Sequence, residues 1–354
     1  MKNIILIYRG QRFKEEIEPK LNQFRHDKVF LVLDNKMTIN IVKWLLKDYT
    51  QDITLVTMWQ YIDKGVLDNM KFDIGIINGP YEMQVGETRG NRGKTKQVWD
   101  KSTKKTLSLI NHNGKLVTWH PPGWRNVTGK YRHIFDLYKS YNIERIDMFD
   151  INKGLEVFNA KTPFDVVYIT KEPYKNRTEL NFIDGTTKTM DITNLEFIPN
   201  YMLDEVFEEV AGLDEETVRV LYERSMYGRD KIHMNDEQVG NFKYPCVYSI
   251  LKDGTVNFMY SNIKKEHFGI PKVICGYGVN PTSIIDEKGE FGLTNFAFGI
   301  VDEVENLPMI QKALHSEKFQ KLNLATKFVA TQGHPLISPK ILSLLKKDFW
   351  KSFV

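Results

Sequence analysis

The chain has 354 residues, of which 27% are charged and 12% are aromatic. This length is enough for two domains of about 100 to 200 residues, and the composition excludes a disordered or fibrous chain. The sequence has no apolar run of about 18 residues and no early apolar segment before a cleavage site. We therefore expect no membrane span and no secretion, but an intracellular, cytoplasmic protein. The formal net charge of +4 is small, so contact with a polyanion requires local clusters of basic residues.

The two cysteines, Cys246 and Cys275, have no Cys or His neighbours at metal-ligand spacing. This pattern fits a reducing compartment and predicts no metal site. We therefore expect both thiols to be buried and to act as small hydrophobic residues.

The first 170 residues alternate short apolar strands with helical segments. Strands are predicted at residues 4–8, 29–33, 53–57, 72–77, 115–119, 143–149 and 165–170, and helical segments up to about residue 24, over 39–46 and over 61–70. Short connections between alternating strands and helices imply right-handed crossovers. The predicted fold class is therefore α/β, with a Rossmann-like parallel sheet that has helices on both faces.

The stretch from Asn78 to Tyr81 reads Asn-Gly-Pro-Tyr and follows the fourth predicted strand. It is expected at the carboxyl edge of the sheet, where open α/β sheets bind ligands. Asn78 and the Gly79 carbonyl offer hydrogen-bond acceptors, Tyr81 offers an aromatic face, and Pro80 restricts the loop. Together they could hold a planar base with an exocyclic amine. The alternative is a β-turn that closes a core strand.

Two other loops bear on a nucleotide site. Asp34 follows the second strand, where a Rossmann-like site places its ribose acceptor, although it could equally cap the next helix. The loop after the first strand has only Gly10, with Arg9 and Arg12 beside it. Such sites normally use closely spaced glycines, which let the backbone approach the ligand. The pocket is therefore expected to be rebuilt or lost.

Residues 86–105 form a glycine-spaced basic segment. Its cations are Arg89, Arg92, Lys94, Lys96 and three further lysines, against two acidic residues. Such a loop can follow a phosphate backbone. The alternative, with equal weight, is a solvated helix face.

Several motifs resemble those of a known family. The Asn-Gly-Pro-Tyr stretch resembles the Asn-Pro-Pro-Tyr motif of DNA adenine methyltransferases, with Gly79 in place of the first proline. After the fifth strand, Pro121-x-x-Trp124-Arg125-Asn126 resembles a second motif of that family. The order of FDVVYI, FIPN, HFGIPKVI and GEFGLTNFAFGIVD is similar to the C-terminal portion of type II restriction-modification adenine methyltransferases and related viral DNA methylases.

The resemblance implies a DNA adenine-N6 methyltransferase that uses S-adenosylmethionine and flips its target base out of double-stranded DNA. Asn78, Gly79, Pro80 and Tyr81 would form the catalytic site, Tyr8, Gly10, Asp34 and Met58 would bind the cofactor, and Arg89, Arg92, Lys94, Lys96, Trp124 and Arg125 would bind DNA. Because the glycine-rich motif is eroded, weak cofactor binding is expected. The alternatives are a pseudoenzyme that binds DNA or a second protein subunit, and an enzyme that uses another donor.

The alternating pattern stops near residue 171. A hairpin is predicted over 178–192 and a helix over 203–222, followed by a loop-rich mixed α/β region. Composition alone puts a boundary within residues 171–200. With the resemblance, we predict a catalytic domain at residues 1–175 and a mixed α/β target-recognition domain at residues 176–354. If the protein is viral, it is expected to act in the host cell.

Overall fold

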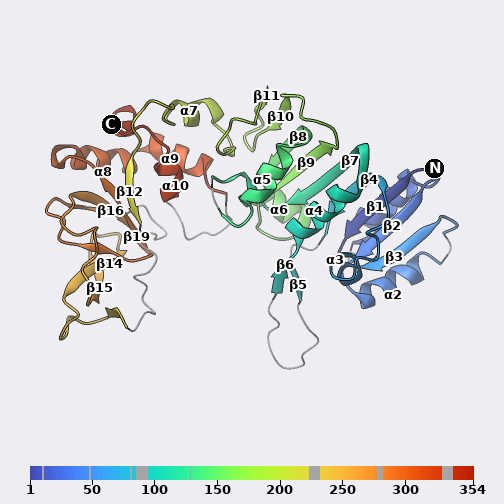
Figure 1. Cartoon of the computed structure of the whole chain (residues 1–354), viewed down its shortest axis with the longest axis horizontal. Helices are drawn as coiled ribbons and strands as arrows, with labels where there is room; N and C mark the ends of the chain where they lie inside the picture. Colours follow the sequence, from blue (N-terminus) through green and yellow to red (C-terminus); the bar gives the residue numbers. More distant parts are fainter. Residues whose placement is uncertain are drawn as a thin grey trace. The chain divides into compact units, whose positions relative to one another are not determined.

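The computed structural model describes residues 1–9, 12–47, 49–79, 82–84, 95–127, 129–222, 232–276, 282–328 and 338–354; for residues 82–84, 95 and 96 it describes the backbone only. The chain forms two compact units, Met1–Glu196 and Phe197–Val354, whose elements are labelled in Figure 1. No helix in the described ranges has both the length and the apolar character needed to cross a lipid bilayer.

The first unit is built on one large sheet, in which the described strands follow the order β11-β10-β8-β9-β7-β4-β1-β2-β3 (Figure 1). The strands are β1 (Asn3–Tyr8), β2 (Lys28–Leu33), β3 (Ile53–Thr57), β4 (Phe72–Asn78), β7 (Ile110–His120), β8 (Asn142–Phe149), β9 (Phe164–Thr170), β10 (Thr178–Asn181) and β11 (Thr187–Met190). Strands β3, β2, β1, β4 and β7 run parallel to one another. The predicted neighbouring positions of the fourth and fifth strands are therefore confirmed.

Helices cover both faces of this sheet, as predicted. On one face, Leu6 and Leu31 of the sheet pack with Ile17, Leu21 and Val42 in a single apolar cluster. These three residues belong to η1 (Phe13–Ile17), α1 (Glu18–Gln23) and α2 (Lys36–Leu45). The opposite face is covered by α3 (Met58–Ile62), α4 (Trp99–Leu109) and α5 (Arg132–Tyr138). Alternate side chains along each strand thus enter two different layers, which confirms the α/β fold class.

The structure differs from the sequence prediction in three places in this unit. Strand β9 runs antiparallel to both β7 and β8. The helix predicted over 61–70 ends at Ile62, because Gly65 adopts a left-handed conformation with φ of 64°. The hairpin β10–β11 does form, but β10 pairs with β8 and extends the first sheet. The first compact unit therefore continues past residue 175 to Glu196.

The second unit is a mixed α/β region, as predicted. One antiparallel sheet has the order β12-β19-β16-β17, and a second sheet has the order β13-β15-β14-β18. Their bounds are β12 (Arg219–Tyr222), β13 (Met234–Asn235), β14 (Tyr244–Ile250), β15 (Val256–Ser261), β16 (Lys272–Gly276), β17 (Ser283–Asp286), β18 (Gly292–Leu293) and β19 (Ala297–Val301). The longer helices are α8 (Leu307–His315) and α9 (Glu317–Ala325), with short helices α7 (Leu203–Glu208) and α10 (Pro339–Leu342).

The helix predicted over 203–222 is wrong beyond Glu208. Residues 219–222 form β12 instead, which pairs antiparallel with β19. The pairing partner lies far away in the sequence, so local periodicity gave no sign of it. Cys246 and Cys275 are buried free thiols on β14 and β16, as predicted.

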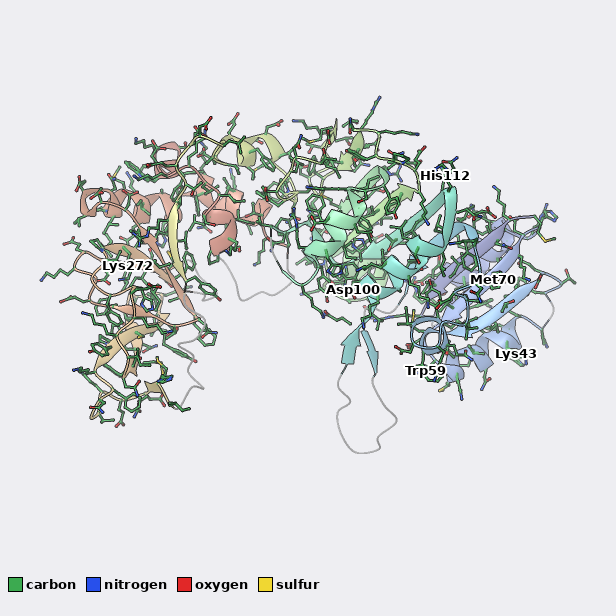
Figure 2. All side chains as sticks on the ribbon, in the orientation of Figure 1. Lys43, Trp59, Met70, Asp100, His112 and Lys272 are labelled. Atoms are coloured by element: carbon green, nitrogen blue, oxygen red, sulfur yellow. The ribbon has the colours of Figure 1, made fainter. Side chains whose placement is uncertain are left out.

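A buried ion pair lies between β16 and β17. Lys272, labelled in Figure 2, is fully buried, and its Nζ donates to Asp286 Oδ2 at 2.7 Å. Nζ also donates to the backbone oxygens of His267 and Ile270, each at 3.1 Å. All three ammonium hydrogens thus have acceptors, which offsets the desolvation of the charge.

Candidate functional site

Four neighbouring parallel strands of the first sheet end at the same level, because their last residues are paired with one another. Tyr8, the last residue of β1, is paired with Asn78 of β4 and with Leu33 of β2, and Leu33 is paired with Thr57 of β3. The next residue along each strand therefore lies at the same carboxyl edge. These next residues are Gly79, Arg9, Asp34 and Met58.

The strand order reverses beside β1. From β1 the chain passes outward through β2 to the edge strand β3, and it then returns to the other side of β1 as β4. The connections that follow β1 and β4 leave in opposite directions. Such a switch point is where open α/β sheets bind ligands.

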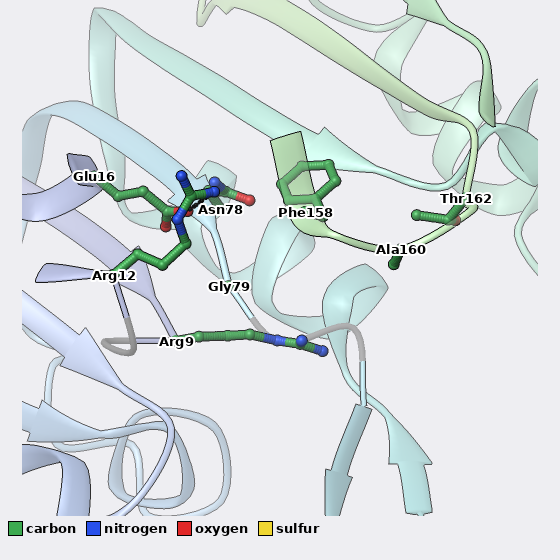
Figure 3. Close-up of a pocket in the computed structure, with 8 residues that line it drawn as sticks. All are labelled: Arg9, Arg12, Glu16, Asn78, Gly79, Phe158, Ala160 and Thr162. Atoms are coloured by element: carbon green, nitrogen blue, oxygen red, sulfur yellow. Dashed lines mark ion pairs between the residues drawn. The ribbon is translucent and has the colours of Figure 1, made fainter. Parts of the chain in front are cut away.

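A pocket of about 250 Å³ lies at this switch point (Figure 3). It is lined by Arg9, Arg12, Glu16, Asn78, Gly79, Phe158, Ala160 and Thr162. Figure 3 shows the charged side chains of Arg12 and Glu16 near Asn78, with Phe158, Ala160 and Thr162 on the other side. Typical small-molecule sites measure roughly 300 to 1,000 Å³. The described pocket lies just below this range.

Asn78 and Gly79 enter the pocket from the end of β4. The Asn78 side-chain amide makes no hydrogen bond in the described part of the chain, so it is available to a ligand. A Cβ atom at Gly79 would lie 2.9 Å from Ile7 Cγ2 and 3.5 Å from Met58 Cε. Since Ile7 is buried in β1, a side chain at position 79 would force the core to move. This packing explains why glycine stands here.

The charged side of the pocket comes from η1 and the end of β1. Arg12 Nη1 lies 3.5 Å from Glu16 Oε1, one turn away. Burial raises the pKa of Glu16, an effect that Arg12 and Arg9 oppose. Burial likewise raises the pKa of Asp34, and Arg9 opposes it. The positive charge of the two arginines beside Gly10 is therefore partly balanced, because Arg12 pairs with Glu16 and Arg9 acts electrostatically on both Glu16 and Asp34.

The aromatic side of the pocket comes from the connection between β8 and β9. Helix α6 (Ile151–Phe158) begins at Asp150, whose Oδ1 accepts from the backbone N–H groups of Asn152 and Lys153 at 3.0 and 2.9 Å. It ends at Asn159, which adopts a left-handed conformation with φ of 54°. The last helical residue, Phe158, is thereby placed at the turn that enters β9.

Close packing fixes this turn. A Cβ atom at Gly154 would lie 1.9 Å from the Thr162 carbonyl oxygen, so only glycine lets α6 approach the turn this closely. The Phe158 ring meets Phe164 edge to face, with 4.8 Å between centroids. Arg12 donates from Nη1 to the Val157 carbonyl oxygen. The aromatic and charged sides of the pocket are therefore linked directly.

The predicted cofactor residues are only partly brought together. Asp34 lies at the carboxyl edge, and its alternative role as a helix cap is wrong, because Asn35 caps α2 by accepting from Thr38 N at 3.0 Å. Tyr8 is 3% exposed and Met58 is fully buried. Neither residue is among those that line the pocket. Their contacts with a cofactor stay predictions.

Several predicted residues lie outside the described ranges. They are Gly10, Pro80, Tyr81, Arg89, Arg92 and Lys94. Lys96 belongs to β6 (Thr95–Gln97), which pairs with β5 (Glu82–Gln84), but only its backbone is described. Their roles stay predictions.

The side chains of Trp124 and Arg125, for which DNA contacts are predicted, both lie in the core of the first unit. Trp124 is fully buried and Arg125 is 1% exposed. Trp124 Nε1 donates to Asp165 Oδ2 at 2.7 Å, and Arg125 donates from Nε to Oδ2 at 2.9 Å and from Nη2 to Oδ1 at 3.2 Å. The motif residues thus neutralise the buried carboxylate of β9 and fix η2 (Pro122–Arg125) against the sheet.

His120 completes this buried cluster at the end of β7. Its Nε2 is 3.0 Å from the Tyr138 hydroxyl, and its ring stacks on Trp99 with 4.7 Å between centroids. Burial lowers the pKa of His120 to about 3. The ring is therefore neutral at physiological pH and acts in packing.

Sequence reasoning missed Glu16 and Phe158. Glu16 lies within a predicted helical segment, where acidic side chains normally face solvent. Phe158 lies between two predicted strands, in a segment for which no element is predicted. Because β9 is antiparallel to β8, it begins at the carboxyl edge of the sheet, and the segment between β8 and β9 that carries Phe158 lies at this edge. The sequence pattern predicted a parallel strand here, so it did not indicate this position for Phe158.

No protein-family model matches the chain, and no curated protein matches it. Among solved structures, the type IIG restriction endonuclease BpuSI is similar over 99% of this chain and 57% of its own, at 9% identity and a TM-score of 0.43. A type I restriction-modification methyltransferase subunit from Streptococcus thermophilus is similar over 58% of this chain, at 14% identity and a TM-score of 0.38. A methyltransferase from Pyrococcus furiosus is similar over 48% of this chain and 75% of its own, at 15% identity and a TM-score of 0.31.

The chain spans about half the length of the type I subunit, at 47%. The matched proteins are methyltransferases or restriction-modification proteins. Neither the identity nor the TM-score at this level assigns a function.

Proposed function

We propose that the first unit transfers a methyl group from S-adenosylmethionine to the exocyclic N6 amine of an adenine flipped out of double-stranded DNA. The second unit would select the target sequence, and a second protein subunit is a candidate partner. The proposal rests on one observation: the unpaired amide of Asn78 lies beside Gly79 in a pocket at the switch point of the sheet, among the residues that the structure describes.

An adenine amine needs help to act as a nucleophile, because its lone pair is delocalised into the ring. The Asn78 side-chain oxygen and the Gly79 carbonyl oxygen would accept its two hydrogens. This arrangement would favour a pyramidal nitrogen and direct the lone pair towards the methyl donor. The amine nitrogen would form its new bond to the methyl carbon as the carbon–sulfur bond of the donor breaks, with the sulfur keeping the electron pair as a neutral thioether. The proton lost from the nitrogen would pass to water, because the Asn78 and Gly79 oxygens accept hydrogen bonds but are too weakly basic to take it, and no covalent bond to the protein is required.

The flipped base also needs a surface to replace its lost stacking, which costs a few kcal/mol. Phe158 lines the same pocket as Asn78 and Gly79. Its ring would cover one face of the base, in addition to the predicted role of Tyr81. An aromatic stack of this kind is worth about 1 to 3 kcal/mol.

The residues at this edge suit the proposed cofactor. S-adenosylmethionine would supply an electrophilic methyl group on a sulfonium. Asp34 stands after β2, where its carboxylate could accept from a ribose hydroxyl. Arg12 and Glu16 offer one cation and one anion at the pocket wall. Because carboxylates accompany the arginines, the affinity need not be as weak as the loss of the glycine motif alone suggested.

The proposal is tested with the Asn78→Ala variant of the full chain. The protein is incubated with S-adenosylmethionine and unmethylated genomic DNA, and N6-methyladenine is then measured by mass spectrometry of the digested nucleosides. We expect wild type to form N6-methyladenine and Asn78→Ala to lose the activity by about 100-fold or more, since it removes a transition-state contact. Its affinity for DNA should stay within a few-fold, since no phosphate contact is lost.

Asn126→Ala is a matched control, because this asparagine lies outside the pocket. Normal methylation by Asn78→Ala would refute the assignment of the site. DNA binding without methylation by wild type would instead identify a catalytically silent DNA-binding protein. A modified adenine of another mass would identify a different donor.

A further inference from the structure

Glu16 is the most unusual group in the pocket. Only 21% of its side chain is exposed, and its sole ion-pair contact among described residues is Arg12, 3.5 Å away. The carboxylate accepts no hydrogen bond from the described part of the chain. An ionised carboxylate has about four acceptor positions, and leaving them unfilled in a half-buried site is unfavourable. Glu16 is therefore prepared for a ligand that donates several hydrogens.

Arg12 has the complementary property. Its side chain is 48% exposed, and its guanidinium is shared between Glu16 and the Val157 carbonyl oxygen. A guanidinium carries five N–H donors, so it can keep these contacts and still bind a carboxylate. An i,i+4 pair this exposed contributes little to stability. Stability alone therefore gives little reason to place this pair at a pocket wall.

A cation and an anion only 3.5 Å apart match the two ends of an α-amino acid, whose ammonium and carboxylate are separated by one carbon. The ammonium supplies three donors for Glu16, and the carboxylate can take two parallel N–H bonds from Arg12. Arg9 also lines the pocket and adds positive charge. A ligand with a single charge would leave one member of the pair unsatisfied.

Building on the proposed function, we infer that Glu16 and Arg12 bind the amino-acid end of the methyl donor, and that Arg12 thereby positions Phe158. Arg12 touches the Val157 carbonyl, one residue before Phe158. A donor carboxylate on the guanidinium would hold Arg12 in place, and the Val157 contact would then hold the end of α6. Arg12 is in this sense a positioning residue for the aromatic side of the pocket.

The binding test uses isothermal titration calorimetry with the full chain and three probes. S-adenosylmethionine has both charged groups, decarboxylated S-adenosylmethionine lacks the carboxylate, and 5′-methylthioadenosine lacks the amino-acid chain. Wild type should bind the first about 10- to 100-fold more tightly than the second. Arg12→Gln should remove this difference. Glu16→Gln should weaken binding of the first two probes by about tenfold and leave 5′-methylthioadenosine unchanged, which also shows that the variant is folded.

Lys14→Gln is a matched control. Lys14 is an exposed residue of η1 that does not line the pocket. Equal affinity of wild type for all three probes, or unchanged binding by Glu16→Gln and Arg12→Gln, would overturn the inference and leave the proposed function intact. Failure of wild type to bind any of the probes, even with DNA present, would overturn both.

Hydrogen–deuterium exchange tests the link to Phe158. At saturating S-adenosylmethionine, the peptide covering residues 151–162 should exchange several-fold more slowly in wild type. At equal occupancy the protection should be absent in Arg12→Gln, and it should be absent in wild type with 5′-methylthioadenosine. Equal protection in all three samples would show that Arg12 does not transmit donor binding to α6.

Discussion

Arg125 offers a direct test of whether the Trp124-Arg125 motif serves the core or DNA. Arg125→Ala would leave the Asp165 carboxylate in the core with Trp124 Nε1 as its remaining side-chain donor among the described residues. Both members of the ion pair are 1% exposed. Breaking such a pair by removing one partner costs about 3 to 5 kcal/mol. For a unit of this size the melting temperature should fall by about 6 to 20 °C.

The assay is calorimetric melting of the full chain, together with fluorescence anisotropy of a labelled duplex well below the melting point. Arg177→Ala, at an exposed position, is the control. We expect a large fall in melting temperature and little change in DNA affinity. The double variant Arg125→Met/Asp165→Leu should recover part of the loss, because an apolar pair needs no charge compensation. A normal melting temperature with strongly weakened DNA binding would refute the core role and restore the predicted DNA contact.

Two further predictions concern the pocket. Gly79→Ala should lower the free energy of unfolding of the first unit by about 1 to 3 kcal/mol, because the new Cβ clashes with Ile7. In an Ile7→Ala background the same change should cost less. Urea unfolding of wild type, the two single variants and the double variant measures this coupling, and additive effects would count against the clash. Burial raises the pKa of Glu16, against the effects of Arg12 and Arg9 and with that of Glu15, so donor affinity should be complete above this raised pKa and fall as pH drops through it. Calorimetry from pH 4.5 to 7.5 should show this fall at a higher pH than an ordinary glutamate gives. Glu16→Gln should remove the contribution of Glu16 and leave that of Asp34, whose pKa burial also raises. An identical profile for the variant would exclude Glu16 as a titrating group.

The first half of the fold could be predicted from the sequence, because each buried strand is a short apolar run that local pattern reveals. Ile4 to Tyr8 and Phe72 to Asn78 are such runs, and they form β1 and β4. The direction of β9 could not be predicted in the same way. An antiparallel strand buried on both faces has the same apolar composition as a parallel one.

The candidate site was only partly predictable for a similar reason. Asn78 and Gly79 follow a strand directly, so position in the sequence placed them at the sheet edge. Phe158 and Glu16 reach the same pocket through tertiary packing that leaves no local signal. Trp124 and Arg125 illustrate the same limit. The resemblance implied DNA contacts for them, and no local pattern indicated their packing in the core, because the buried carboxylate that they bind lies 40 residues or more further along the chain.

The reversal of β9 has a consequence for how this protein could diversify. Since β8 ends and β9 begins at the same edge of the sheet, the connection between them turns over that edge and need not cross a face. Residues 159–161 could therefore gain or lose length without altering the pairing of the two strands. Such changes would reshape the side of the pocket that carries Phe158 without altering the strand end that carries Asn78 and Gly79. Because Arg12 contacts the Val157 carbonyl oxygen in the same connection, they would also act on the Arg12–Glu16 pair.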